Sequence, residues 1–461
     1  MVSLASLLAL LLIPGVALAA SPGSALNAGD EAWVLASSAL VLIMTPGLAL
    51  FYGGMVRKKN ALTTIMQVFV VIGIVSVQWV LFGYSLAFGP DFHHIIGTLA
   101  WIGFRHVGAA PDAAYAPTIP NELYSIFQMM FAIITPALIV GGLAERMKFK
   151  AFVLFIVLWA TFIYDPLAHW VWGTGGWLHT LGVLDFAGGT VVHISSGVAG
   201  LVVALMLGRR KGYGHDESIR AHNVPMIVLG TALLWFGWFG FNAGSAVSAG
   251  PLAASAFLVT NTATAAASLT WMAIEWLRRG KPSIVGACAG AVCGLVAITP
   301  ASGFVGPMSS IVIGIGGGAF CYFGASVLKN RFGYDDALDA FGGHGIGGTW
   351  GAIATGLFAS VAINAGGANG LFFGNPKQLL LQLVGVGATW VFSAVGTAIL
   401  FKVTDLLVGC RVKPEEEDEG LDASLHGEDA YPEIVSPVAL ARFFGQDDAP
   451  STGAPGRAFT G

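Results

Sequence analysis

Two histidines occupy matching positions in stretches that are otherwise small and apolar. His193 lies in DFAGGTVVHISSGVAGL (185–201) and His344 in DALDAFGGHGIGGTWG (336–351), and both follow the spacing Asp-x7-His-x3-Gly-x2-Gly. A neutral imidazole donates a hydrogen bond at one ring nitrogen and accepts one at the other, and it titrates near neutral pH. The repeated pattern therefore predicts two related segments that bring a pair of histidines to one site.

Three interpretations of the pair compete. Each histidine could be a packed residue bonded to a carbonyl, the pair could ligate a metal or haem, or the rings could line a narrow apolar pore. Metal or haem ligation would require further ligands or redox partners, which the sequence does not offer. A pair of ionisable residues inside a membrane favours a functional role over simple packing. We favour the pore, because small residues beside both histidines leave room next to the rings: Gly188, Gly189, Ser195, Gly197, Gly342, Gly343 and Gly345.

The composition is that of a membrane protein. Of 461 residues, 55% are hydrophobic and only 10% are charged, too few to cover a soluble globule. Apolar runs long enough to cross the bilayer as helices recur along the chain. Eleven transmembrane helices are predicted in this all-α polytopic protein, at 32–56, 62–88, 122–144, 149–171, 188–208, 223–246, 252–277, 282–300, 307–328, 338–361 and 378–409.

Charge and spacing predict the topology. Lys and Arg cluster after every odd-numbered span, which places those loops and the C-terminus in the cytoplasm and the N-terminus outside. The two histidine segments open spans 5 and 10, so they have opposite orientations. This arrangement predicts an inverted 5+5 repeat, typical of channels and transporters with a substrate path at the repeat interface.

The predicted pore limits the substrate. A bare inorganic cation would lose its hydration shell with too few oxygens to replace it. Ammonium can shed a proton, cross as neutral ammonia and regain the proton, whereas potassium has no proton to lose. An ammonium-like substrate is therefore favoured.

The two ends differ from the membrane region. Residues 1–19 have an apolar run followed by Ala17-Leu18-Ala19, which favours a cleavable signal peptide over a first transmembrane helix. The membrane domain is predicted at 31–409. An acidic segment follows at 410–434, and 435–461 is predicted to be a disordered extension.

Several motifs together resemble one family. LDFAGGTVVHISSGVAGL, FQMMFAIITPALIVGGLAERM, GWFGFNAGSA, KPSIVGACAGAVCGLVAITPASG and DAFGGHG, in this order, resemble the ammonium transporter (Amt/MEP) family, and bacterial members in particular. The likeness runs from about residue 31 to 431. It implies a homotrimer in the bacterial inner (cell) membrane with one pore per subunit and no cofactor.

The resemblance also implies roles for single residues. Trp172, Ser245 and Phe131 would bind ammonium at the outer face, although Trp172 at a span end also suits an interfacial belt residue. Phe131 and Phe241 would close the pore below that site, and without the motif both would pass as core or lipid-facing residues. Three aspartates would play structural or electrostatic roles, and one glutamine would be a polar neighbour of the entrance: Asp185, Asp336, Asp339 and Gln128.

The acidic tail resembles the family's cytoplasmic segment that meets a PII-type signalling protein. Two alternatives stay open: a Rhesus-type channel for neutral ammonia or carbon dioxide, disfavoured by the complete cation-site motif, and an ammonium sensor that signals through its tail. Proton co-movement is undecided. The sequence offers neither a nucleophile paired with a base nor a metal site with an open position, so an enzyme is not predicted. A glycine precedes His344 where the family often has a branched residue, so we expect a looser ring there.

Overall fold

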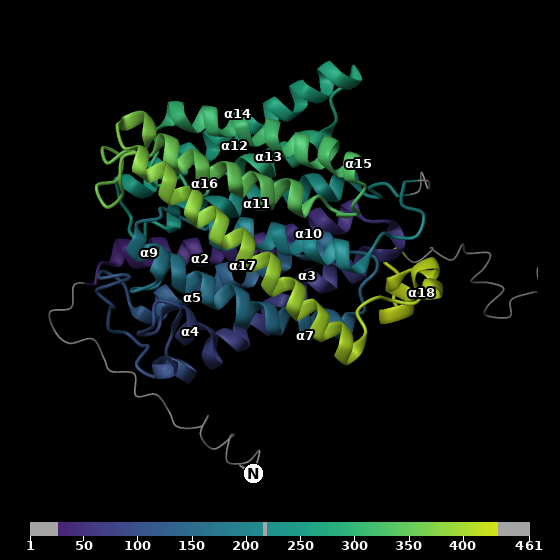
Figure 1. Ribbon diagram of the computed structural model, residues 1–461, viewed down its shortest axis with the longest axis horizontal. Helices are drawn as coiled ribbons and strands as arrows, with labels where there is room; N and C mark the ends of the chain where they lie inside the picture. Colours follow the sequence, from purple (N-terminus) through teal and green to yellow (C-terminus); the bar gives the residue numbers. More distant parts are fainter. Residues whose placement is uncertain (1–25, 215–218, 432–461) are drawn as a thin grey trace, which may run out of the picture.

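The computed structural model describes residues 26–214 and 219–431, so the predicted signal peptide and the extension 435–461 lie outside the described residues. Long helices run roughly along one direction, with α9 at one end of the molecule and α18 at the other (Figure 1). We call these the α9 end and the α18 end. Within the described ranges, nine helical segments are long and apolar enough to cross a membrane: Ala28–Met55, Lys58–Phe88, Asn121–Leu143, Phe149–Leu181, Gly189–Leu207, Val224–Gly244, Pro251–Arg279, Pro307–Phe332 and Pro376–Val408. The protein is a helical membrane protein.

Four of these segments, α2, α11, α12 and α17, are single helices from end to end, whereas others combine several helical pieces, including π-helix. The elements are α2 (Ala28–Met55), η1 (Lys58–Asn60), α3 (Ala61–Gln78), η2 (Trp79–Gly83), α4 (Tyr84–Phe88), α5 (Asn121–Leu138), α6 (Val140–Leu143), α7 (Phe149–Trp159), η4 (Ala160–Tyr164), α8 (Asp165–Trp172), α9 (Trp177–Leu181), η5 (Gly189–Ile194), α10 (Ser195–Leu207), α11 (Val224–Gly244), α12 (Pro251–Arg279), α14 (Pro307–Tyr322), η6 (Phe323–Leu328), α15 (Lys329–Phe332) and α17 (Pro376–Val408). π-Helical turns often mark functional sites.

The two other predicted spans, 282–300 and 338–361, contain shorter helices. These are α13 (Ile284–Ile298), η7 (Phe341–Gly345) and α16 (Ile346–Phe358). The long loop between α4 and α5 carries the short hairpin β1 (Asp91–Phe92) and β2 (Ile96–Gly97) and the turn η3 (Leu99–Phe104). The remaining elements are η8 (Leu371–Phe373), α18 (Pro414–Glu419) and η9 (Asp422–His426).

Small residues let the helices approach closely. A Cβ placed on Gly230 of α11 would lie 2.4 Å from the backbone nitrogen of Phe51 in α2. A Cβ on Gly142 would lie 2.2 Å from the carbonyl oxygen of Gly200 in α10. Such small-residue contacts are typical of helix packing in membranes, where burial of apolar surface gives no advantage over lipid.

Helix α17 crosses the molecule obliquely and contacts α7, α10 and α16 (Figure 1). Its outward side chains are apolar and exposed, including Leu380, Val391, Ile399 and Leu406. An apolar exposed face on a long helix suits contact with lipid. The helix therefore braces the segments that carry both histidines on its inner side.

Candidate functional site: a histidine pair beneath stacked phenylalanines

The two histidines meet in the protein interior. His193 lies in η5 and His344 in η7, their Nδ1 atoms are 3.2 Å apart, and their ring centroids are 5.3 Å apart. Both are almost fully buried. Two facing nitrogens form a hydrogen bond only when one carries hydrogen and the other does not. The pair therefore shares one proton between its Nδ1 atoms.

An aspartate caps each histidine segment. Asp185 accepts hydrogen bonds from the backbone nitrogens of Gly188, Gly189 and Thr190, at 2.8, 2.7 and 2.7 Å. Asp336 likewise accepts from the nitrogens of Ala340 and Phe341 at 3.1 and 2.8 Å. These bonds satisfy free N–H groups at the start of each helical segment.

Burial has the largest influence on the pKa of both capping aspartates. It raises the pKa of Asp185 although four hydrogen bonds oppose it, and it raises the pKa of Asp336 to about 6, with Asp339 adding to the rise. Asp339 makes no such cap. It has a left-handed backbone (φ 57°), pairs with Lys329 at 2.7 Å and lines a small cavity with His344 and Tyr52 at the α18 end.

Glycines allow the two histidine segments to touch. A Cβ on Gly197 would lie 2.1 Å from the backbone nitrogen of Gly345, and one on Gly348 would lie 2.9 Å from the Cβ of His193. Side chains at these positions would push the segments apart. The glycines of the repeated motif are therefore a condition of the histidine contact.

Towards the α9 end, aromatic rings cover the histidines. Phe131 and Phe241 are stacked with centroids 4.2 Å apart, and both are buried. The ring of His193 lies 6.0 Å from Phe241 and 5.4 Å from Trp238, nearly parallel to both. A cavity of about 10 Å³ lies between these rings and His344. This volume is near the lower limit for one water molecule, so only a very small molecule fits.

A wider cavity of about 430 Å³ opens above Phe131 at the α9 end, and Trp172 and Ser245 line it. Trp172 meets the ring of Phe131 edge-on at 6.0 Å and donates its indole N–H to the carbonyl of Asp185. The Ser245 hydroxyl donates to the carbonyl of Phe241 at 2.8 Å. Its lone pairs are thus left for a donor in the cavity.

Gln128 also lines this cavity. Its nitrogen donates to the hydroxyl of Tyr124 at 3.2 Å, and its buried oxygen has no partner in the protein. An unpaired buried acceptor beside aromatic faces suits a small cation that donates hydrogen bonds.

Two further residues at the site, Trp238 and Tyr52, were not expected from the sequence. Trp238 stacks on His193 and donates to the Thr299 hydroxyl at 2.9 Å. Tyr52 donates to the carbonyl of Leu138 and lines the cavity at the α18 end. The one available signal was the place of Trp238 one helical turn before Phe241 in GWFGFNAGSA.

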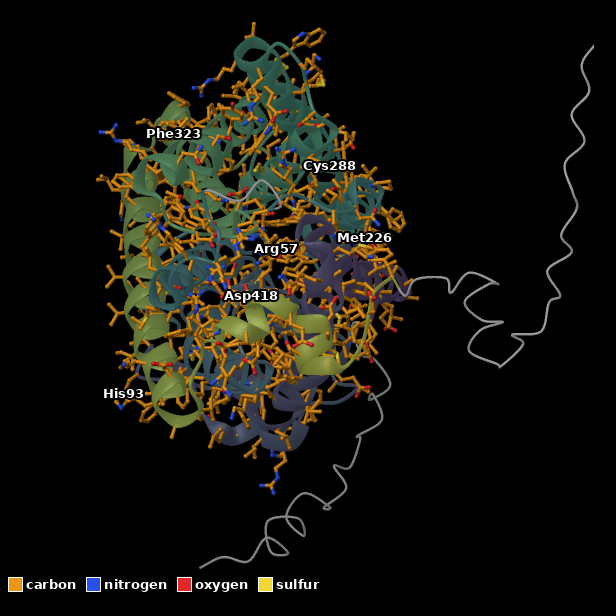
Figure 2. The ribbon with its side chains drawn as sticks, turned by 90° about the vertical axis from the view of Figure 1, so that its right-hand side faces the viewer. Arg57, His93, Met226, Cys288, Phe323 and Asp418 are labelled. Carbon is orange, nitrogen blue, oxygen red and sulfur yellow. The ribbon has the colours of Figure 1, made fainter. Side chains whose placement is uncertain are left out.

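The tail segment 411–431 packs on the α18 end, where it lies across the ends of several helices (Figure 2). Asp422 accepts from the backbone nitrogens of Leu62 and Thr63 at the start of α3. The Leu421 nitrogen donates to Asn60, and Arg411 pairs with Glu417 at 2.9 Å. A cavity of about 860 Å³ lies between the tail and the first loop, lined by Arg57, Lys58, Lys59, Lys211, Gly212, Glu417, Asp418, Glu419, Asp422, Ala423, Glu428 and Asp429.

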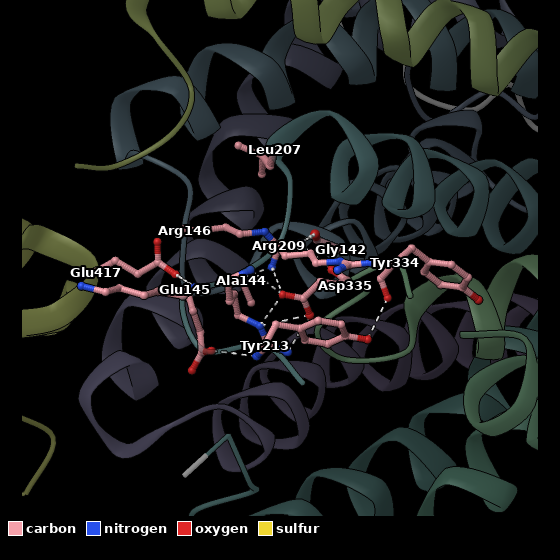
Figure 3. Close-up of polar contacts among 12 residues, drawn as sticks. Gly142, Ala144, Glu145, Arg146, Leu207, Arg209, Tyr213, Tyr334, Asp335 and Glu417 are labelled. Atoms are coloured by element: carbon pink, nitrogen blue, oxygen red, sulfur yellow. Dashed lines mark hydrogen bonds and ion pairs between the residues drawn. The ribbon is translucent and has the colours of Figure 1, made fainter. Parts of the chain in front are cut away.

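Beneath the tail lies a group of buried or nearly buried charges that we call the charge cluster: Arg57, Glu145, Arg146, Arg210 and Asp335. Figure 3 labels Glu145, Arg146 and Asp335 of this cluster. Glu145 contacts Arg57 Nε at 3.1 Å and Arg210 Nη1 at 2.7 Å, and Arg210 Nη2 contacts Asp335 at 2.8 Å. Burial alone would raise the pKa of Glu145, but Arg210 and Arg57 outweigh it and lower the pKa to about 2. Burial would also raise the pKa of Asp335, but hydrogen bonds from Arg210 and the positive charges of Arg146 and Arg210 outweigh it and lower that pKa.

Within the described ranges, no three His, Cys, Asp or Glu side chains gather as a metal site would require. The geometry instead defines a class: a helical membrane protein with a cavity at one end, a stacked pair of phenylalanines beside it and a small enclosed cavity next to two buried histidines. Comparison with known proteins gives the same class. The model of the Ammonium Transporter Family matches residues 32–431.

Individual relatives agree. An ammonium transporter of Bacillus subtilis is 55% identical over 403 residues, which cover 87% of this chain and 98% of that protein. The crystal structure of Saccharomyces cerevisiae Mep2 superposes with a TM-score of 0.80 at 39% identity, covering 85% of this chain and 88% of Mep2. A sensor Amt protein superposes with a TM-score of 0.78 at 30% identity, covering 86% and 98%. The chain belongs to the ammonium transporter family, as its resemblance predicted.

Proposed function

We propose that the protein recruits ammonium in the cavity of Trp172, Phe131 and Ser245, where ammonium gives up a proton, and conducts ammonia past Phe131 and Phe241 along His193 and His344. The released proton either returns to water in that cavity or crosses along the two histidines, a route that we call the histidine relay and that would make transport carry current. At the far end ammonia takes up a proton from water. The observation that carries the proposal is the 3.2 Å contact between two buried histidines directly beneath a stacked phenylalanine pair.

The chemistry follows from the lining. Ring faces and the Ser245 lone pairs favour a cation that donates hydrogen bonds. The path beyond has room for one small molecule, and its apolar walls make a charged passenger costly. The histidine pair, which shares one proton, offers an acceptor or a donor as that proton shifts between the rings. Potassium would meet the same desolvation cost without a proton to release.

The proposal includes eleven spans in an inverted 5+5 repeat, with α13 and η7–α16 as the two short spans. Support comes from the matching caps Asp185 and Asp336 and from the two π-helical turns that carry the histidines. The α9 end then faces outward and the α18 end the cytoplasm, in agreement with the placement of Lys and Arg. Cysteine labelling from either side of a bacterial inner membrane tests this orientation.

The family resemblance further implies a homotrimer, and light scattering of the purified protein tests it. The tail and its cavity of about 860 Å³ are proposed to receive a cytoplasmic PII-type protein. Basic and acidic side chains face each other across that cavity, so an inserted loop would find partners of both signs. Binding assays with and without residues 411–431 test the partner.

A mutant pair tests the transport path. In liposomes on a solid support, the wild-type protein should give a saturable current with ammonium and methylammonium but not with potassium. The His193→Ala/His344→Ala double variant should lose that current while remaining folded. Normal ammonium flux in the double variant would contradict the histidine relay, and an internal pH rise without current would favour neutral passage of ammonia.

A sensor is the second candidate, because a sensor Amt protein superposes on the chain at 30% identity. It would carry little flux and signal through the tail. Ammonium-dependent binding of a PII-type protein by a variant with no measurable flux would favour this function.

A further inference from the structure

A carboxyl group is buried in the membrane region outside the proposed path. Asp165 is the first residue of α8, and its side chain is fully buried. Its Oδ2 accepts a hydrogen bond from Gln78 Nε2 at 2.6 Å, and its Oδ1 has no partner. Intramembrane carboxyl groups are costly and therefore require an explanation.

The partner, Gln78, is the last residue of α3 and is also buried. Its oxygen Oε1 has no partner either. Each residue adjoins a π-helical turn, η2 after Gln78 and η4 before Asp165. A Cβ on Gly83, the last residue of η2, would lie 2.5 Å from that Oε1. The glycine thus keeps open the space that the carboxamide occupies.

No cation balances Asp165 among the ion pairs of the described residues. The histidine one turn further along α8, His169, has both ring nitrogens engaged: Nδ1 faces the Ala87 carbonyl at 3.0 Å and Nε2 faces Asp91 at 2.9 Å. The nearby Thr161 hydroxyl donates to the Val157 carbonyl. Gln78 is therefore the main polar partner of the Asp165 carboxyl.

A carboxylate ion in this place would have one neutral amide donor against the loss of its hydration, which is insufficient. It would also leave two acceptor oxygens, Asp165 Oδ1 and Gln78 Oε1, without a donor, although the two side chains already share one hydrogen bond. A single proton on Oδ1 removes the charge and supplies the missing donor. A neutral acid and an amide that already share one hydrogen bond can add a second, which would close a ring and pair both orphan oxygens.

We infer that Asp165 is a proton-binding site, held as the neutral acid in a two-bond ring with Gln78, and that this ring fixes the helix that ends at Trp172. Helix α8 is then attached to the α3–η2–α4 segment at two levels, through Asp165 to Gln78 and through His169 to Ala87. Asp165 and Gln78 are positioning residues, since neither lines the cavity of Trp172. This second part rests on the proposed role of Trp172 in ammonium binding.

Infrared spectroscopy tests the proton site without any transport. The wild-type protein in lipid at neutral pH should show the C=O stretch of neutral carboxylic acid, and the wild-type minus Asp165→Asn difference spectrum should contain one such band. Tyr164→Phe is the matched control, because it removes a buried and unpaired polar atom, the Tyr164 hydroxyl, from the adjacent position, and it should keep the band. If Asp165→Asn removes carboxylate bands instead, the site is ionised and the inference fails.

Stability and kinetics test the ring and its role. Asn offers the same donor and acceptor as the neutral acid, so Asp165→Asn should keep the wild-type unfolding temperature and KM. Asp165→Ala and Gln78→Leu should lower the unfolding temperature and raise the KM for ammonium by about twofold to tenfold, the range for one buried hydrogen bond, with a smaller change in kcat. If Asp165→Asn and Asp165→Ala changed the unfolding temperature and KM equally, the two-bond ring would be overturned. An unchanged KM in folded Asp165→Ala would overturn the positioning role, while the infrared result would stand even if the histidine relay failed.

Discussion

At the scale of single residues, the cavity at the α9 end combines aromatic faces with acceptors that the protein leaves unpaired. Trp172 is held by a hydrogen bond to the Asp185 carbonyl, so its position depends on the residue that also caps the His193 segment. Ser245 and Gln128 present oxygen atoms to the same space. The proposed cation site and the placement of His193 therefore depend on one aspartate.

Gln128 offers a specific test of recruitment. Gln128→Met keeps the length of the side chain but removes the unpaired acceptor, so the KM for ammonium should rise by roughly tenfold to a hundredfold, equivalent to one hydrogen bond to a cation. Current against ammonium concentration measures it. Tyr124→Phe, which removes only the hydroxyl that accepts from Gln128, should have a smaller effect. A KM unchanged by Gln128→Met would place this oxygen outside the binding site.

At the scale of elements, two π-helical turns bring the histidines together, and glycine is required where backbones meet. Gly197→Ala would set a methyl group 2.1 Å from the Gly345 nitrogen, whereas a Cβ on Gly343 has no atom within 4 Å. We therefore expect Gly197→Ala to lose at least about tenfold in ammonium current per folded protein, because misplacement by about 1 Å has effects of this order.

Gly343→Ala is the matched control in the histidine segment itself. It should keep most of the current, because the added methyl group meets open space next to His344. Gel filtration before the flux measurement gives the folded fraction of each variant. Wild-type current in Gly197→Ala would show that the close contact of the two segments is not needed.

The elements also show how far sequence reasoning reaches. The shared spacing around His193 and His344 predicted their meeting, because one pattern in two apolar stretches implies a repeat. The pair of Gln78 and Asp165 could not be predicted, since the two residues are 87 positions apart and their contact depends on how α3 and α8 pack.

At the scale of the whole molecule, the charge cluster joins segments that are distant in sequence. Arg57 follows α2, Glu145 follows α6, Arg210 follows α10, and Asp335 precedes η7. The tail reaches this cluster through Asn60, which accepts from Leu421 and donates to Glu145 at 3.0 Å. The docked tail and the His344 segment are thus attached to one buried ionic network. Removing one partner from a buried ion pair costs far more stability than removing one from an exposed pair.

Acid should weaken this network in a defined direction. The pKa of Glu145 falls from 4.5 to about 2 on folding, so its contribution to stability is complete above about pH 4.5 and is lost as the pH falls towards 2. Glu145→Gln should lower the free energy of unfolding at neutral pH by roughly 3 kcal/mol, because Arg57 and Arg210 lose a buried anion. The difference in free energy of unfolding between the wild-type protein and Glu145→Gln should then narrow below pH 4.5. The raised pKa of Asp336 makes the protein more stable as the pH falls, but the wild-type protein and Glu145→Gln share this effect, so it cancels when their free energies of unfolding are compared.

Glu428→Gln is the control, because it removes an exposed carboxylate from the tail. Its unfolding free energy should follow that of the wild-type protein at every pH. Thermal unfolding in lipid or detergent at several pH values measures these differences, and a gap that stays constant down to pH 3 would mean that Glu145 is not the titrating anchor of the cluster.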